Sequence, residues 1–272
     1  MTRRFLHLLA LPALAAAPIL AQGLSADQVI AKNIEAKGGM AKLKAIKTIR
    51  LTGKAMFGPV EAPFVMEQKR PGSFYQDVTV QNMHLIQAYD GKTGWTINPF
   101  AGYGGKKDPE PMTADELKQA DQQADLDGPL VDYKDKGHQI DYQGKEDVDG
   151  SPAHKLKVTL KNGTVQTLFL DADSFLELKQ TTKRKVRDTE VETEAIFGDY
   201  KEEGGVMMPH SLEMGAKGMP QKQKLIIEKV EINPALDDAK FKMPEKKAEP
   251  VPAPGTEKKA EPAKPASVEK KG

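Results

Sequence analysis

The fold is constrained most by a long series of short segments in which apolar and polar residues alternate, with turn residues between them. The clearest turn is Asn162-Gly163, because both residues tolerate a positive φ and so favour a two-residue hairpin loop. This loop predicts pairs between Leu160 and Val165 and between Leu156 and Phe169. One face of the predicted hairpin is apolar and the other is mostly polar, as in an antiparallel sheet with one buried face.

Comparable alternation recurs along most of the chain and predicts an antiparallel meander. The expected strands are residues 48–57, 60–67, 74–80, 84–89, 95–97, 138–144, 156–160, 165–170, 175–182, 191–200, 207–214 and 223–232. Pro63 predicts an edge position or a bulge, because proline cannot donate a hydrogen bond within a sheet. The Gly- and Pro-rich segment 99–111, which contains Phe100 and Tyr103, is expected to be an irregular loop.

Two capping boxes predict helices inserted into this meander. Residues 25–28 begin one helix, which ends at Gly38-Gly39, and residues 113–116 begin another, whose apolar stripe is thin. A further short helix is expected from Pro129. Because the helices interrupt the sheet rather than alternate with its strands, the expected fold class is mainly β with helical inserts (α+β).

Residues 1–21 have the pattern of a secretory signal peptide. Two arginines precede an apolar stretch that Pro12 and Pro18 interrupt, and Ala21 is a small residue suited to cleavage. We expect export by the general secretion route rather than the twin-arginine route. The chain has no cysteine, so it can form no disulfide and carry no lipid-modified cysteine. The expected location is the periplasm, as a soluble protein.

The C-terminal residues 244–272 consist almost wholly of Pro, Lys, Glu and Ala, and residues 245–250 recur as residues 257–262. Such a segment has nothing to bury and is expected to be a disordered, solubilising tail. The alternative is an extended tether that reaches a partner. Residues 22–243, between the two ends, are long enough for one β-rich domain with a sizeable core.

Composition and motifs argue against nucleic-acid binding and against catalysis. The formal net charge is +1, and no basic stripe is present. The chain has neither a cysteine nucleophile nor a Gly-x-Ser-x-Gly motif. His84, His138, His154 and His210 are not spaced as a metal pair, and the mixed charges of residues 183–194 are expected on a solvated strand pair. We therefore expect a monomer that is not an enzyme and that holds no cofactor and no metal.

The remaining functional signal is apolar surface. The candidate lining residues are Phe57, Phe64, Met66, Phe74, Trp95, Ile97, Phe169, Met207 and Met208 on the strands and Leu117 on the second helix. Because few helices are available to cover a sheet this long, an apolar cavity suited to acyl chains is expected beneath them. Methionine side chains adapt well to flexible ligands. An ordinary filled core is the alternative for any one of these residues.

A family likeness spans nearly all of residues 23–244. It is carried by residues 26–39, 43–53, 89–98, 168–173 and 228–244. In these segments the chain resembles periplasmic outer-membrane lipoprotein-sorting proteins of the LolA-like superfamily. The resemblance implies a curved antiparallel sheet, or incomplete β-barrel, that short helices cover as a lid. It also implies lipids or lipoprotein acyl chains as cargo, an inner-membrane donor complex and an outer-membrane acceptor.

In carriers of this family an arginine near the cavity helps to hold the lid closed. Arg50 and Arg70 lie on early expected strands, and no motif identifies either of them. The Pro/Lys/Glu-rich tail departs from the compact carriers. The leading hypothesis is a carrier or binder of lipids or lipoprotein acyl chains. The alternative is a non-catalytic interaction or sensor module of the cell envelope with a tethering tail.

Overall fold

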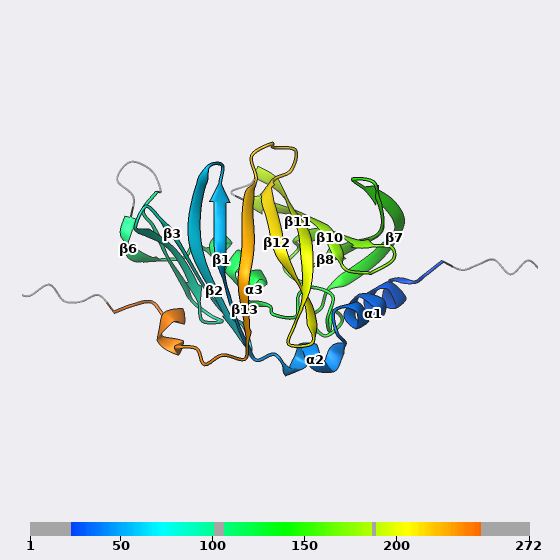
Figure 1. The fold of residues 1–272 in the computed structure, drawn as a ribbon, viewed down its shortest axis with the longest axis horizontal. Coiled ribbons are helices and arrows are strands. Elements are labelled where there is room, and N and C mark those ends of the chain that lie inside the picture. The colour runs from blue at the N-terminus through cyan, green and yellow to red at the C-terminus, as the bar shows by residue number, and fades with distance from the viewer. Residues whose placement is uncertain (1–22, 101–105, 187–188, 246–272) are drawn as a thin grey trace, which may run out of the picture.

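The computed structural model describes residues 23–100, 106–186 and 189–245. The predicted signal peptide, Tyr103 and the tail beyond residue 245 lie outside the described residues. The described part forms an open, thirteen-stranded antiparallel sheet with a few short helices (Figure 1). This confirms the fold class predicted from the alternation of apolar and polar residues.

Consecutive strands are antiparallel neighbours except β6 and β7, and one further pairing joins β1 to β13. Their bounds are β1 (Thr48–Phe57), β2 (Val60–Lys69), β3 (Ser73–Val80), β4 (Met83–Tyr89), β5 (Gly94–Asn98), β6 (Lys106–Pro111), β7 (Gln139–Val148), β8 (Ser151–Thr159), β9 (Val165–Asp171), β10 (Glu177–Val186), β11 (Thr189–Glu203), β12 (Val206–Ala216) and β13 (Gln223–Ile232). The order across the sheet is β6-β5-β4-β3-β2-β1-β13-β12-β11-β10-β9-β8-β7. An N-terminal half, β1–β6, therefore meets a C-terminal half, β7–β13, at the pairing of β1 with β13.

Because β6 and β7 lie at opposite edges, the chain between them must cross the sheet. This connection, residues 112–138, contains α3 (Ala114–Ala124) and a series of turns. Helix α3 packs on β3 and β4, and in Figure 1 it lies behind β1 and β13. We call the face that α3 covers the inner face and the opposite one the outer face. The topology, rather than a strong apolar stripe, places this helix over the sheet.

The other helices lie near the ends of the sheet. They are α1 (Ala26–Ala36), α2 (Met40–Ala45) and the 3-10 helix η1 (Asp238–Phe241). Both predicted capping boxes are present, with Ser25 capping α1 and Thr113 capping α3. Gly38 follows α1 with a φ of 113°, and a Cβ there would lie 2.4 Å from the carbonyl oxygen of Gly205. Glycine is therefore required where α1 ends against the β11–β12 turn.

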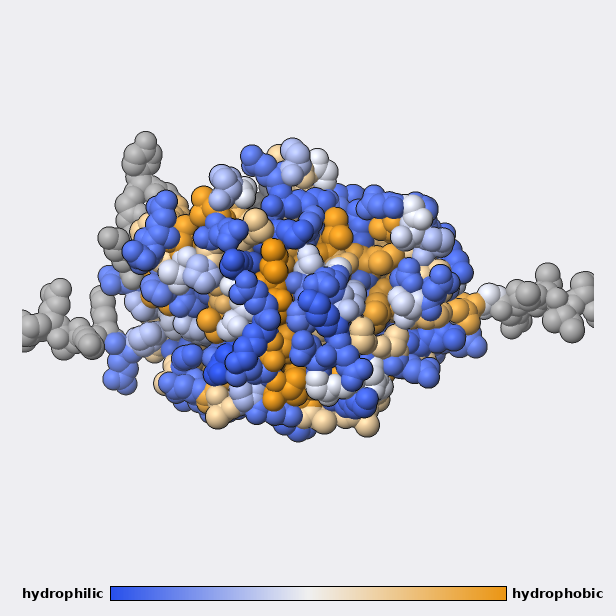
Figure 2. Space-filling model, viewed as in Figure 1, coloured by the Kyte–Doolittle hydropathy of each residue, from blue (hydrophilic) through white to orange (hydrophobic). Residues whose placement is uncertain are grey.

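The core lies along the inner face. One cluster joins the two halves of the sheet and contains Ile49, Leu51, Phe64, Val78, Val206, Leu225 and Ile227. A second cluster holds α1 on β8 and β9, and a third holds α3 on β3 and β4. The outer face carries cross-strand ion pairs, such as Lys179 with Glu194 at 3.0 Å. Figure 2 accordingly shows a mostly hydrophilic surface, crossed by a narrow apolar stripe.

The predicted two-residue loop of the β8–β9 hairpin is wrong. The backbone N–H of Leu160 donates to the carbonyl oxygen of Thr164 at 2.9 Å, so the loop has three residues between them. Gly163 occupies the left-handed position with a φ of 84°. A type I turn followed by a left-handed glycine is the common geometry for such a loop, and Asn-Gly suits it as well as it suits the shorter one.

The longer loop shifts the pairing of the hairpin by one residue. Leu156 pairs with Leu168, whereas the shorter loop predicts Phe169. Because strand residues alternate between faces, this shift turns Leu168 to the inner face and Phe169 to the outer face. Leu168 and Leu170 belong to the cluster beneath α1, so their apolar character follows from the register.

Three further local expectations differ from the structure or are refined by it. Residues 106–111 form the edge strand β6 instead of continuing an irregular loop. Residues 126–137 form successive turns, with positive φ at Gly128, Asp132 and Gly137, so no helix begins at Pro129. Pro63 lies in an interior strand, but the pairing of β2 with β3 ends at Phe64 and requires no donor from the proline.

Candidate ligand-binding site beneath helix α3

Helix α3 covers the inner face through a small apolar contact with the N-terminal half of the sheet. Ala120 and Ala124 are buried against Phe74 and Tyr89, and Leu117 packs against the same cluster. Burial of apolar groups stabilises by about 0.8 kcal/mol per CH₂ group, so two alanines and one leucine hold the helix only weakly. The apolar attachment of α3 therefore consists of the thin stripe expected from the sequence.

Hydrogen bonds attach α3 unequally to the two halves of the sheet. On the N-terminal half, the hydroxyl of Tyr89 donates to Asp121 Oδ1 at 3.3 Å, and the Gln68 side chain donates to the carbonyl oxygen of Gln123. On the C-terminal half, the described side chains provide one hydrogen bond, from Gln122 Nε2 to Thr164 Oγ1 at 3.3 Å. The boundary between α3 and the C-terminal half is therefore the weaker one.

Two clefts lie along this boundary, and Gln122 and Asn162 line both of them. The first has a volume of about 400 Å³ and is lined by Asp115, Lys118, Gln119, Gln122, Asn162, Gly163, Thr164, Val165, Lys183, Arg184, Lys185 and Glu190. The second has a volume of about 560 Å³ and is lined by Pro71, Gly72, Asp121, Gln122, Asp125, Gly128, Pro129, Lys136, His138, Leu160, Lys161, Asn162 and Gln166. We call the two clefts together the seam. Most of its lining residues are polar or charged, unlike the residues of the apolar core.

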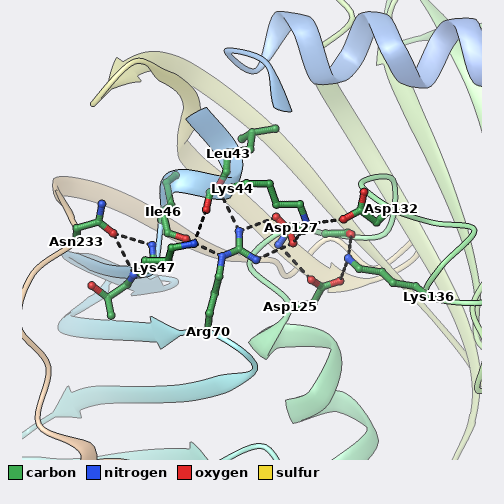
Figure 3. Close-up of polar contacts among 12 residues, drawn as sticks. Leu43, Lys44, Ile46, Lys47, Arg70, Asp125, Asp127, Asp132, Lys136 and Asn233 are labelled. Atoms are coloured by element: carbon green, nitrogen blue, oxygen red, sulfur yellow. Dashed lines mark hydrogen bonds and ion pairs between the residues drawn. The ribbon is translucent and has the colours of Figure 1, made fainter. Parts of the chain in front are cut away.

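A buried ion pair fixes the segment that follows α3. Arg70, at the end of β2, donates through both terminal nitrogens to the two carboxylate oxygens of Asp127, each at 2.7 Å (Figure 3). The same guanidinium donates to the carbonyl oxygens of Ile46 at 2.7 Å and Leu43 at 3.2 Å. Lys44 Nζ lies 2.7 Å from Asp127 Oδ2. We call the contacts among Arg70, Asp127 and Lys44 the latch, because they join α2, the end of β2 and the loop after α3.

The latch keeps the buried Asp127 carboxylate in its charged form. The Asp127 side chain is only 6% exposed. Burial opposes its ionisation, but hydrogen bonds from Arg70 and Lys44 hold its pKa at about 2. Charged hydrogen bonds of this fork-like kind are stronger than neutral ones. Arg70 thus joins the end of β2 to α2 and to the loop after α3. Arg50 lies on the outer face, where its Nε donates to Glu67 at 2.7 Å.

The structure brings six of the ten candidate lining residues to one side of the sheet. Phe64, Met66, Phe74 and Met208 lie on the inner face, Leu117 faces it from α3, and Phe57 lies at its rim with 38% of its surface exposed. The strand register turns the other four, which are Trp95, Ile97, Phe169 and Met207, to the outer face. The alternation of strand residues therefore separates neighbours such as Met207 and Met208.

The inner face continues beyond these six residues and changes character across the sheet. Half-buried apolar residues extend it over the central strands; these are Val80, Leu85, Leu212 and Met214. Towards β9 and β10 it becomes polar, with Gln166, Gln180, Thr182 and Arg184 on the same side as Leu168. This polar part was not predicted, because uncharged Gln and Thr side chains carry no functional motif and Arg184 lies in a run of mixed charges typical of a solvated strand pair.

The histidines are dispersed and serve local contacts. His154 Nδ1 lies 2.9 Å from the Tyr142 hydroxyl, and its ring stacks on Phe175 with the centroids 4.9 Å apart. Burial lowers the pKa of His154 and of His138. The described residues contain no group of three His, Cys, Asp or Glu side chains that could hold a metal ion. Within the same residues, no helix is long and apolar enough to span a membrane.

No family model matches this chain, and no curated protein matches it. Solved structures do resemble it. A DUF1329 family protein from Desulfovibrio piger matches with a TM-score of 0.54 and 13% identity, over 79% of this chain and 95% of that one. A putative outer membrane lipoprotein-sorting protein domain from Vibrio parahaemolyticus matches with a TM-score of 0.51 and 10% identity, over 79% and 95% of the two chains.

A third structure, of a LolA superfamily protein from Nitrosomonas europaea, matches with a TM-score of 0.53 and 11% identity. The match covers 80% of this chain and 98% of that one. Identities this low carry information about the fold alone. The chain therefore has a LolA-like fold, as the sequence resemblance implies.

Proposed function

We propose that this protein is a non-catalytic periplasmic carrier or binder of lipids or lipoprotein acyl chains, which it receives on the inner face beneath α3. The observation that carries the proposal is the unequal attachment of α3. Apolar contacts and hydrogen bonds hold the helix on the N-terminal half, whereas among the described side chains Gln122 provides its one hydrogen bond to the C-terminal half. An inner-membrane donor and an outer-membrane acceptor are the partners that such a carrier requires.

Opening the seam would expose apolar surface at modest cost. The inner face of the central strands carries half-buried side chains, among them Met66, Leu212 and Met214. Acyl chains that take the place of α3 on this surface would recover the hydrophobic free energy, about 25 cal/mol per Å² of apolar area. The latch keeps the end of the connection in place through Asp127, so α3 can move without detaching the whole segment.

The proposal is tested by locking the seam. The chain contains no cysteine, so Gln122→Cys with Thr164→Cys introduces one defined pair across the boundary. Displacement of the apolar fluorescent dye N-phenylnaphthylamine by a fatty acid measures binding. We expect the oxidised pair to lose binding and the reduced pair to recover it. A wild-type protein that binds neither the dye nor fatty acids would refute the carrier function.

The matched control places a cysteine pair where no movement is needed. Thr167 and Thr181 are directly opposed on the outer face of β9 and β10. A disulfide between Thr167→Cys and Thr181→Cys should leave dye binding unchanged in both redox states. Loss of binding in this control would show that oxidation itself, rather than closure of the seam, causes the effect.

A second function, as an interaction module of the envelope, is favoured by the C-terminal segment. Phe241 of η1 is buried on the outer face, and Lys240 Nζ lies 3.3 Å from the buried Glu67 carboxylate. The chain after η1 therefore starts from the side opposite α3. Deletion of residues 246–272 separates the two functions. A carrier keeps fatty-acid binding without the tail, whereas an adaptor loses a partner protein in pull-down assays.

A further inference from the structure

We infer that the seam binds the anionic head of an amphiphile at Arg184, while the acyl chain lies on the apolar part of the inner face. The ligand class is a lipid with a phosphate or carboxylate head rather than a neutral lipid. This inference rests on the proposed function and names the chemistry of its ligand.

The first observation is the environment of the Arg184 side chain. Its Nε atom is buried, and no hydrogen-bond partner for it is present. A guanidinium keeps its charge at all physiological pH values, so a buried N–H without an acceptor is unfavourable. The cleft of about 400 Å³ lies directly beside it. Phosphate and carboxylate groups match the forked geometry of arginine donors.

The second observation is the balance of charge around this cleft. Its charged lining residues are Lys118, Lys183, Arg184, Lys185, Asp115 and Glu190. Each acidic group already faces a lysine, since Asp115 lies 3.4 Å from Lys118 and Glu190 lies 4.0 Å from Lys183. Within the described part of the chain, Arg184 has no carboxylate partner. The cleft therefore offers an anion an uncompensated positive charge.

The third observation is the continuity between Arg184 and apolar surface. Arg184 pairs with Val191, and the same side of β11 then carries Thr193, Ala195 and Phe197. The last two pair with Met214 and Leu212 of the inner face. From residue 191 to residue 197 an extended strand covers roughly 20 Å. A charged end and an apolar end are thus joined along one side of the sheet, as in an amphiphile.

The test uses two lipids that share one acyl chain and differ in the phosphate, lauroyl lysophosphatidic acid and monolauroylglycerol. Both are titrated below their micelle concentrations against the full chain loaded with N-phenylnaphthylamine. The phosphate offers Arg184 a charged hydrogen-bond acceptor, whereas the free glycerol hydroxyl group does not, so we expect the wild type to prefer the anionic lipid roughly tenfold or more. Arg184→Gln should remove this preference and Arg184→Lys should keep part of it. Lys54→Gln, on the exposed outer face, should keep all of it.

The outcomes separate the inference from the proposed function. Equal binding of both lipids by the wild type, or a preference that survives in R184Q, overturns the headgroup site while the carrier function stands. Failure of the wild type to bind the dye or either lipid overturns both. Inorganic phosphate is titrated alone as well. If it binds at Arg184 as tightly as the anionic lipid does, the ligand is a free anion and the amphiphile is refuted.

Discussion

Arg70 and Asp127, 57 residues apart in the sequence, form a two-pronged ion pair in which both oxygen–nitrogen distances are 2.7 Å. The pair links the end of β2 to the loop that follows α3. This loop belongs to the connection, residues 112–138, that crosses the sheet. Arg70 also bonds the carbonyl oxygens of Leu43 and Ile46 around α2. One guanidinium therefore joins the end of β2 both to α2 and to the loop after α3.

Asp127→Asn should destabilise the protein by about 1–3 kcal/mol, because it removes charged hydrogen bonds and leaves Arg70 without its counter-charge. Urea unfolding measures the free energy. Hydrogen exchange should also accelerate in α3 more than in the central strands. Asp135→Asn is the matched control, since Asp135 lies in the same connection and is exposed. An unchanged unfolding free energy in D127N would show that the latch does not hold the connection.

The stabilisation by Asp127 should disappear in acid. Its pKa is about 2 in the folded protein and 3.8 ordinarily, so the folded state binds the proton less readily than the unfolded state. The contribution is therefore complete above about pH 4 and is lost as the pH falls towards 2, by about 2 kcal/mol in total. The difference in unfolding free energy between the wild type and D127N should shrink between pH 5 and pH 2.5. A constant difference would contradict a lowered pKa.

Most of the sheet is predictable because its signals are local. Capping boxes at Ser25 and Thr113 and the alternation along β1 or β13 depend on residues close in the sequence. The register of the β8–β9 hairpin is not predictable from local signals, because Asn162-Gly163 fits loops of two and of three residues. This one-residue difference in loop length decides whether Phe169 faces the core or the outer surface.

The site is less predictable, because it depends on which distant segments meet. Nothing in the neighbourhood of Arg70 indicates Asp127, and the pairing arises only once the connection crosses from β6 to β7. Arg184 and Lys183 are neighbours in a charged run, yet the register places them on opposite faces. A sequence pattern gives the period of a strand, but the topology decides which side is covered.

His154 should make the stability fall as the pH drops below about 6.5. Burial and the charge of Lys145 lower its pKa from 6.5, so the neutral form is favoured in the folded state. Its contribution is present above about pH 6.5 and is lost as the pH falls through the lowered pKa. His154→Phe, which can keep the stacking on Phe175, should flatten this part of the curve of unfolding free energy against pH. A curve that H154F leaves unchanged would contradict this role of His154.

Phe241→Ala should separate stability from ligand binding. Phe241 is 2% exposed in η1, which packs on the outer face of β3 and β4, so its truncation should cost about 3 kcal/mol. Binding of N-phenylnaphthylamine at a temperature where the variant is folded should be unchanged, because η1 and α3 lie on opposite faces. Met243→Ala, at a position 45% exposed, is the control and should change neither property. A folded F241A variant that no longer binds the dye would place the ligand, or a path to it, on the outer face.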